Sequence, residues 1–171
     1  MIQFDPSLGC SDMVFFLITS LLYLLATVSG EEMLRISSAE MKNFWSNYPP
    51  AILHDGNIYN FAHSSSTKDG MWIRINLVQR SLITRVLVYN RSECCQERII
   101  GASLFIKLGD QYVKHCGDLS TAKIEYDFHC TGGGDVVEVS QEGSVEAWNL
   151  AEIRVYGTPL PSPGLNMTTM F

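Results

Sequence analysis

The sequence has few charged side chains and no run of basic residues. Only 18% of its 171 residues are charged, and the formal net charge is −6. Nucleic-acid-binding surfaces need clustered Lys and Arg, so the sequence gives no support for a DNA or RNA partner. It also lacks a CxxC pair, which argues against a structural zinc site, and it has no internal repeat. The length allows one domain with a core, together with a leader and a tail.

One long run, Met13 to Ser29, is apolar and free of charge. Its length suits a secretory signal, whereas a membrane-spanning helix needs about 20 apolar residues. We therefore expect cleavage near Gly30 and a secreted, extracellular protein. The preceding segment contains Asp5 and Asp12 but no Lys or Arg, so a membrane anchor through residues 13–29 is the alternative. The expected organisation is a signal peptide or signal anchor at 1–30, a domain at 31–157 and a Pro-rich disordered tail at 158–171.

Outside the leader, which contains Cys10, the chain has four cysteines that allow three connectivities. A bond between Cys94 and Cys95 would hold their Cα atoms about 3.8 Å apart, below the usual disulfide range of roughly 4.4–6.8 Å. Such strain is commoner at binding sites than in plain loops; the alternative is two unrelated cysteines. We expect Cys94–Cys95 together with Cys116–Cys130, whose loop of about 15 residues is worth roughly 3 kcal/mol.

Short strands dominate the pattern after a lead-in that ends at Pro50. Apolar and polar residues alternate, or branched residues accumulate, in segments separated by turn residues. This pattern predicts an all-β antiparallel sandwich of about eight strands, either immunoglobulin-like or a jelly roll. We expect a short helix over Ser38 to Trp45 and a loop at Gly132-Gly133-Gly134-Asp135. The expected strands are 72–77, 82–89, 103–108, 111–114, 123–128, 136–140 and 150–156.

Two arginines flank the adjacent cysteines in the segment Asn90-Arg91-Ser92-Glu93-Cys94-Cys95-Gln96-Glu97-Arg98. Guanidinium groups present planar, fixed donors that can orient hydroxyls or carboxylates. The segment also opens with an Asn-x-Ser sequon, and Asn166 opens an Asn-x-Thr sequon in the tail. Such sequons are usable only in an exported protein. A glycan on Asn90 would crowd the segment, so we expect Asn166 to be the better acceptor.

Together with Asp55-Gly56-Asn57, Asn60-Phe61, Trp72, Gly101-Ala102 and Leu150-x-Glu152-Ile153, this segment resembles the F-type lectins, or fucolectins. The resemblance covers about residues 51–157. It implies a discoidin-like jelly roll that is secreted and binds fucose.

The resemblance also implies a carbohydrate-binding site. Arg91 and Arg98 match the family's sugar-binding arginines, and Cys94–Cys95 matches the disulfide that packs against the sugar. Glu93 stands where the family usually has Asp and could orient Arg91. The family's sugar-contacting histidine aligns with Lys68, and a shifted gap would bring His63 into that role. The implied site residues are Arg91, Arg98, Cys94, Cys95, Lys68, His63, Phe61 and Glu93.

A structural calcium ion is the second implication of the resemblance. The matching positions are Asp55, Asn57, Ser65 and Glu152. Their carboxylate, amide and hydroxyl oxygens are the hard ligands that Ca²⁺ takes.

The function expected from the resemblance is a lectin that recognises terminal fucose or a similar sugar on glycans, with avidity from a homo-oligomer. The alternative is a discoidin-like interaction module whose sugar pocket has decayed and which binds a protein or membrane surface. Lys68 in place of the histidine favours that alternative. An enzyme is not expected, because no motif marks the pair of carboxylates that a glycosidase needs about 5–10 Å apart.

Overall fold

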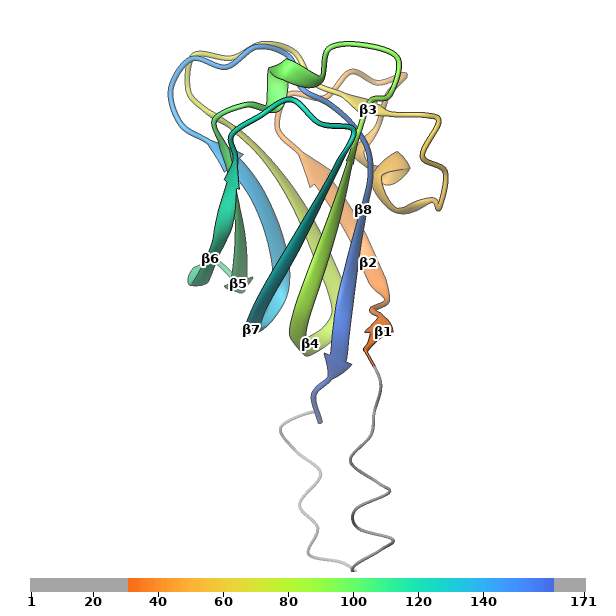
Figure 1. The fold of residues 1–171 in the computed structure, drawn as a ribbon, viewed down its shortest axis with the longest axis vertical. Coiled ribbons are helices and arrows are strands. Elements are labelled where there is room, and N and C mark those ends of the chain that lie inside the picture. The colour runs from red at the N-terminus through yellow and green to blue at the C-terminus, as the bar shows by residue number, and fades with distance from the viewer. Residues whose placement is uncertain (1–30, 162–171) are drawn as a thin grey trace, which may run out of the picture. The chain divides into compact units, whose positions relative to one another are not determined.

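A computed structural model describes residues 31–161, which form antiparallel β-structure with two short 3₁₀ helices (Figure 1). The expected leader, Cys10 and the Asn166 sequon lie outside these residues. Among residues 31–161, no helix is both long and apolar enough to cross a membrane. The elements are β1 (Glu32–Met33), β2 (Ile36–Met41), η1 (Pro50–His54), β3 (Ala62–His63), β4 (Met71–Asn90), η2 (Gln96–Ile99), β5 (Ala102–Leu108), β6 (Gln111–Leu119), β7 (Glu125–Gln141) and β8 (Asn149–Pro159).

β4 and β7 each contribute to both layers of the sandwich. The first arm of β4, residues 71–77, pairs with β2 and with the second arm of β7. After a register shift, residues 81–90 pair with β8 and with the first arm of β7. The path through the sheets is β1-β8-β4-β7-β5-β6, with β2 on β4 and β3 on β8. The sequence predicted two separate strands, 72–77 and 82–89, where the structure has the single bent strand β4. It likewise predicted 123–128 and 136–140 where the structure has the single bent strand β7 (Figure 1).

The glycine run Gly132–Gly134 lies inside β7, so the predicted loop was wrong. These residues pair with Ser81–Ile83 where both long strands bend. A Cβ on Gly134 would collide with the backbone carbonyl oxygen of Lys107. Gly134 is therefore required by the close approach of β5, and not by a turn.

The predicted helix over Ser38 to Trp45 was also wrong, because the first part of this segment is β2. β2 pairs along the first arm of β4, where the Asn76 amide donates to Ser38 Oγ and Glu40 Oε1 at 2.9 Å each. Pairing with the open edge of a sheet outweighs local helix propensity here.

The last strand continues past the predicted end of the domain. Thr158 and Pro159 belong to β8 and pair with Leu82 and Ser81. The chain therefore stays in the sheet for two residues that the sequence assigned to the tail.

The core lies between the two layers and is built by alternation along the strands. Ile73 and Ile75 of β4, Val137 and Val139 of β7 and Val155 of β8 are fully buried. Burying each such side chain is worth about 1.5–3 kcal/mol. The predicted Cys116–Cys130 disulfide is present and joins β6 to β7, with Cα atoms 5.3 Å apart.

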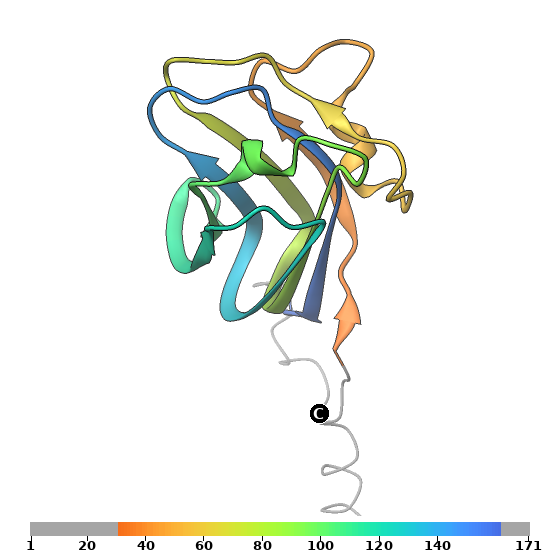
Figure 2. The same ribbon diagram turned by 45° about the horizontal axis from the view of Figure 1, so that its top comes forward.

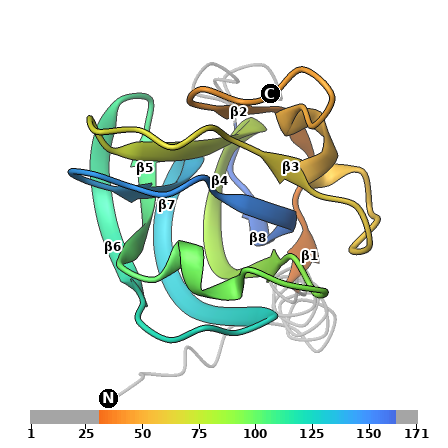
Figure 3. The same ribbon diagram turned by 90° about the horizontal axis from the view of Figure 1, so that it is seen from above.

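The connections that carry the candidate site gather at one end of the sandwich (Figures 1 and 2). η1, β3, η2 and the loop between β7 and β8 all lie there, whereas the described chain begins and ends at the opposite end. Seen from above, these loops lie over the end of the sandwich (Figure 3). Segments that are distant in the sequence therefore meet at the loop end.

Candidate functional site

The segment that follows β4 is held in shape by its own amide side chains. Asn90 is 2% exposed, and its Nδ2 donates to the backbone oxygens of Gln96 (3.0 Å) and Lys123 (3.2 Å). The Gln96 amide in turn donates to the carbonyl oxygens of Arg91 and Ser92, both at 2.9 Å. Because the Asn90 amide nitrogen is buried and engaged, its position disfavours glycan attachment.

Cys94 and Cys95 are bonded to each other, with Cα atoms 3.8 Å apart. Both are half-buried, and Cys95 has a left-handed backbone with φ 67°. A non-glycine residue in this conformation costs roughly 1–3 kcal/mol. Cys95 immediately precedes η2, and its carbonyl oxygen accepts a 3.3 Å bond from the Arg98 amide. The paired cysteines thus form a fixed corner between Arg91 and Arg98.

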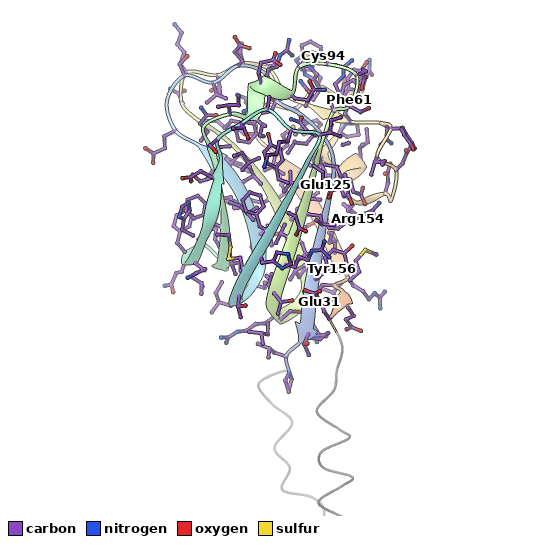
Figure 4. The ribbon with its side chains drawn as sticks, viewed as in Figure 1. Glu31, Phe61, Cys94, Glu125, Arg154 and Tyr156 are labelled. Carbon is purple, nitrogen blue, oxygen red and sulfur yellow. A yellow bond between two sulfur atoms is a disulfide. The ribbon has the colours of Figure 1, made fainter. Side chains whose placement is uncertain are left out.

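Arg91 is oriented from two sides. Its Nε donates to Glu93 Oε1 at 2.8 Å, and its guanidinium carbon lies 3.9 Å from the Phe61 ring centroid. The pKa of Glu93 is lowered by its own backbone hydrogen bond and then by Arg91. Phe61 and Cys94 both lie at the loop end, while Tyr156 of β8 and Glu31, just before β1, lie away from it (Figure 4). Arg91 therefore contacts two other predicted site residues, Glu93 and Phe61.

The ion pair of Arg98 is longer than that of Arg91. Its Nε lies 3.9 Å from Glu146 Oε2, and the Glu146 side chain is 80% exposed. An exposed ion pair of this kind contributes at most about 1 kcal/mol. The Arg98 donors are therefore available to a ligand. Glu146 belongs to the loop between β7 and β8, and no motif in the sequence pointed to it.

His63 and Lys68, the two alternatives for the family's sugar-contacting histidine, lie on different sides of the site. His63 is 8% exposed, and its Nδ1 donates to the Ser64 carbonyl oxygen at 2.7 Å, which leaves Nε2 as an acceptor. Lys68 is exposed and lines a hollow of about 350 Å³ together with Glu146, the partner of Arg98.

An aromatic cluster surrounds His63. Trp45 stacks on the His63 ring with centroids 4.6 Å apart, and Tyr48 stacks on Phe61 at 5.1 Å. Phe61 is tilted against His63 at 6.2 Å, so this cluster connects His63 to Arg91. Trp45 is half exposed, at 50%. The sequence marked Trp45 only as the end of a predicted helix and did not mark Tyr48.

Three of the four predicted calcium ligands lie together. Asp55 and Glu152 line one hollow, and the Gly56 backbone amide donates to Glu152 at 3.2 Å. The Asn57 backbone amide donates to Asp55 Oδ1 at 2.9 Å, and Asn57 Oδ1 accepts from the Tyr59 backbone amide at 3.0 Å. Burial raises the pKa of Glu152, which is 3% exposed. A buried carboxylate beside a second one suits a divalent cation with oxygen ligands.

The fourth predicted ligand does not fit this group. Ser65 accepts a 2.6 Å hydrogen bond from the Trp45 indole and so belongs to the aromatic cluster. Arg154 lies 3.4 Å from Glu152 and partly supplies the positive charge that an ion would bring. Within residues 31–161, no three side chains among His, Cys, Asp and Glu converge on one point. The donor set therefore fits Ca²⁺ through Asp55, Asn57 and Glu152 only.

Residues 53–149, more than half of the chain, match the family described as "NedA-like, galactose-binding domain". The chain belongs to this family. Fucolectin-3 of Anguilla japonica is 40% identical to this galactose-binding-domain protein over 52 residues, which are 30% of this chain and 29% of that protein. The chain spans about a third of the length of the curated relatives it matches.

Solved structures have the same fold at low sequence identity. The serum fucolectin of striped bass (Morone saxatilis) is 23% identical with a TM-score of 0.62, and covers 72% of this chain and 46% of that one. A fucose-binding module of Streptococcus pneumoniae is 16% identical with a TM-score of 0.67, and covers 75% and 97%. These neighbours confirm the discoidin-like β-sandwich. The family and the neighbours are carbohydrate-binding modules and not enzymes, in agreement with the prediction from the sequence.

Proposed function

We propose that this domain is an extracellular lectin that binds terminal fucose or a similar sugar on glycans. One observation carries the proposal: Arg91 and Arg98 flank the Cys94–Cys95 corner, and Arg91 is fixed against Phe61. Guanidinium donors can hold neighbouring sugar hydroxyls, while the sulfur corner and the ring offer apolar surface to a C–H face or a methyl group. The fucolectins and fucose-binding modules among its relatives support the same ligand class.

Fucose-array binding of the recombinant chain tests this function, with Arg91→Ala and Arg98→Ala as the site variants. A hydrogen bond to a charged group is worth about 1.5–3 kcal/mol, so each change should weaken binding roughly ten- to hundredfold. Arg80→Ala is the matched control, because Arg80 is exposed at the bend of β4, away from the loop end. Absence of fucose binding by the parent, or binding indifferent to both site variants, would refute the proposal.

Calcium belongs to the same proposal as a structural ion. Asp55, Asn57 and Glu152 would hold it. Its positive charge would offset the repulsion between the neighbouring carboxylates of Asp55 and Glu152. The residues also tie the segment after η1 to β8 through the Gly56–Glu152 hydrogen bond. Secretion follows from the signal-like leader, and a homo-oligomer would supply avidity to a weak single site.

The second candidate is an interaction module that binds a protein surface through the same end. Its support is the burial of His63 beneath Trp45, together with the exposed aromatic side chains of Phe44 (47%) and Trp45 (50%). Cell-surface attachment that persists in the Arg91→Ala variant and is lost in Trp45→Ala would favour this candidate over the lectin.

A further inference from the structure

A further cavity lies on the outer face of the sheet formed by β4, β7, β5 and β6, the strands that lie side by side in Figure 3. Its volume is about 740 Å³, within the range of roughly 300–1,000 Å³ that ligand pockets occupy. Its lining shares no residue with the Arg91–Arg98 site. The lining residues that matter here are Trp72, Arg74, Phe105, Tyr112, Glu138 and Gln141.

A buried charge network underlies this cavity. Glu138 and Lys107 are each 2% exposed. Glu138 Oε2 accepts from Lys107 Nζ (2.9 Å) and Arg74 Nε (2.6 Å), and its Oε1 accepts from the Tyr112 hydroxyl (2.9 Å). Burial raises the pKa of Glu138, but the hydrogen bonds from Lys107, Arg74 and Tyr112 outweigh it and leave that pKa lowered. Stability alone does not require a buried ion pair, since apolar residues would serve as well. The network does fix Arg74 and Tyr112 at the cavity.

An unpartnered acceptor lies at the other end of the cavity. Gln141 Oε1 is buried and has no hydrogen-bond partner among the described residues. Gly101 allows this side chain to lie close, because a Cβ there would be 2.9 Å from Gln141 Nε2. A buried acceptor without a partner costs about 1–3 kcal/mol, so a ligand donor that reached it would recover that free energy.

Aromatic side chains form the remaining surface of the cavity. Tyr112 is 61% exposed and packs edge-on against Phe105 with ring centroids 4.9 Å apart. The Arg74 guanidinium lies 4.7 Å above the Trp72 ring. Its NH1 is 3.6 Å from Asp110, which is 93% exposed, so the group keeps donors free for a ligand. Exposed rings beside fixed donors and an acceptor suit a ligand with both C–H faces and hydroxyls.

The charges around the cavity disfavour an anionic ligand. Arg74 and Lys107 exceed Glu138 by one positive charge, and Asp69 and Glu142 line the same cavity with two negative ones. We propose that this sheet face is a second saccharide site, which binds a neutral oligosaccharide independently of Arg91 and Arg98. Tyr112 packs on the sugar ring, Arg74 donates to its hydroxyls, and Gln141 Oε1 accepts from one of them.

The test uses the full chain carrying Arg91→Ala and Arg98→Ala, so that the loop site is disabled, on an array of neutral, uronic-acid and sulfated oligosaccharides. We expect this double variant to retain binding to neutral oligosaccharides. Adding Tyr112→Ala or Gln141→Leu should weaken that binding about tenfold or more. Tyr59→Ala is the matched control, because Tyr59 is an 83% exposed tyrosine that does not line the cavity, and it should change nothing.

Three results would overturn the second site: no neutral-oligosaccharide binding by the double variant, binding that is unaffected by Tyr112→Ala and Gln141→Leu, or binding confined to acidic glycans. An amide NMR titration of the double variant with the same neutral oligosaccharide should shift residues of β5 and the second arm of β7. Because the proposed fucose site is tested on the parent through Arg91 and Arg98, the two proposals can fail separately.

Discussion

The guanidinium carbon of Arg91 lies 3.9 Å from the ring centroid of Phe61, although 30 positions separate the two residues in the sequence. Phe61 precedes β3, and Arg91 follows β4. Their contact therefore joins the loop before β3 to the cysteine segment. A cation above an aromatic ring gains about 0.5–2 kcal/mol. It also removes rotamer freedom from an arginine whose orientation the ligand would need.

Phe61→Leu should weaken fucose binding about threefold to tenfold. The leucine keeps apolar volume but removes the ring on which Arg91 rests, so the guanidinium has to be ordered when the ligand binds. Isothermal titration calorimetry with a fucosylated oligosaccharide measures the change. Phe61→Tyr keeps the ring and should bind like the parent. Equal affinities of the leucine and tyrosine variants would show that the contact has no role in binding.

The two disulfides should separate binding from stability. Cys94→Ser with Cys95→Ser opens the corner between the arginines, so glycan affinity should fall about tenfold or more while the fold persists. Cys116→Ser with Cys130→Ser should lower the free energy of unfolding by roughly 3 kcal/mol, because it releases a loop between β6 and β7, and should leave affinity unchanged.

Urea unfolding and glycan titration on both pairs of variants give the comparison. Each pair of cysteine variants serves as the control for the other pair. If removal of Cys94–Cys95 costs stability and leaves affinity at the parent value, the corner is structural and is not part of the sugar site.

The cysteine segment was predictable because its parts are adjacent in the chain. Arg91, Glu93 and both cysteines fall within a few residues, and the Asn90 and Gln96 amides that brace them come from the same segment. Glu146 was not predictable, because it reaches Arg98 from a loop after β7 that has no sequence signal. Whether His63 or Lys68 faces a sugar also depended on tertiary structure.

The hydrogen-bond network around Glu138 could not be predicted from the sequence, for a different physical reason. Glu138 alternates with buried valines, as a solvent-facing strand position should, and nothing in its segment indicates burial. Its partners Arg74, Lys107 and Tyr112 come from three other strands, so only the sheet order brings them together. The bends in β4 and β7 were missed similarly, since each arm has an ordinary strand pattern.

Calcium should stabilise the domain through Asp55, Asn57 and Glu152. At a Ca²⁺ concentration about 100-fold above Kd, the gain is about 2.7 kcal/mol, which raises Tm by several degrees, and a chelator should reverse it. Glu152→Gln removes one charged ligand and should abolish the shift. Ser65→Ala should retain it, because Ser65 bonds Trp45 instead. A Tm that is indifferent to Ca²⁺ in the parent, as measured by calorimetry, would exclude the ion.

The Glu138 network should contribute stability that is lost in acid. The pKa of this carboxyl is lowered in the folded protein, with Lys107, Arg74 and Tyr112 donating to it. The unfolded value is about 4.3, so the contribution is fully present above that pH and disappears as pH falls through the lower folded pKa. Glu138→Gln should cost about 3–5 kcal/mol near neutral pH, because it leaves Lys107 buried without its counter-charge.

Urea unfolding of the parent and of Glu138→Gln between about pH 3 and 7 measures this difference, which should shrink toward the acid end. Glu142→Gln removes an exposed acid from the next loop and should follow the parent curve throughout. Adding Lys107→Met to Glu138→Gln should recover part of the lost stability, because the unpaired buried cation is then gone. A constant difference between parent and Glu138→Gln across the whole pH range would mean that packing, and not the charge of Glu138, stabilises this face.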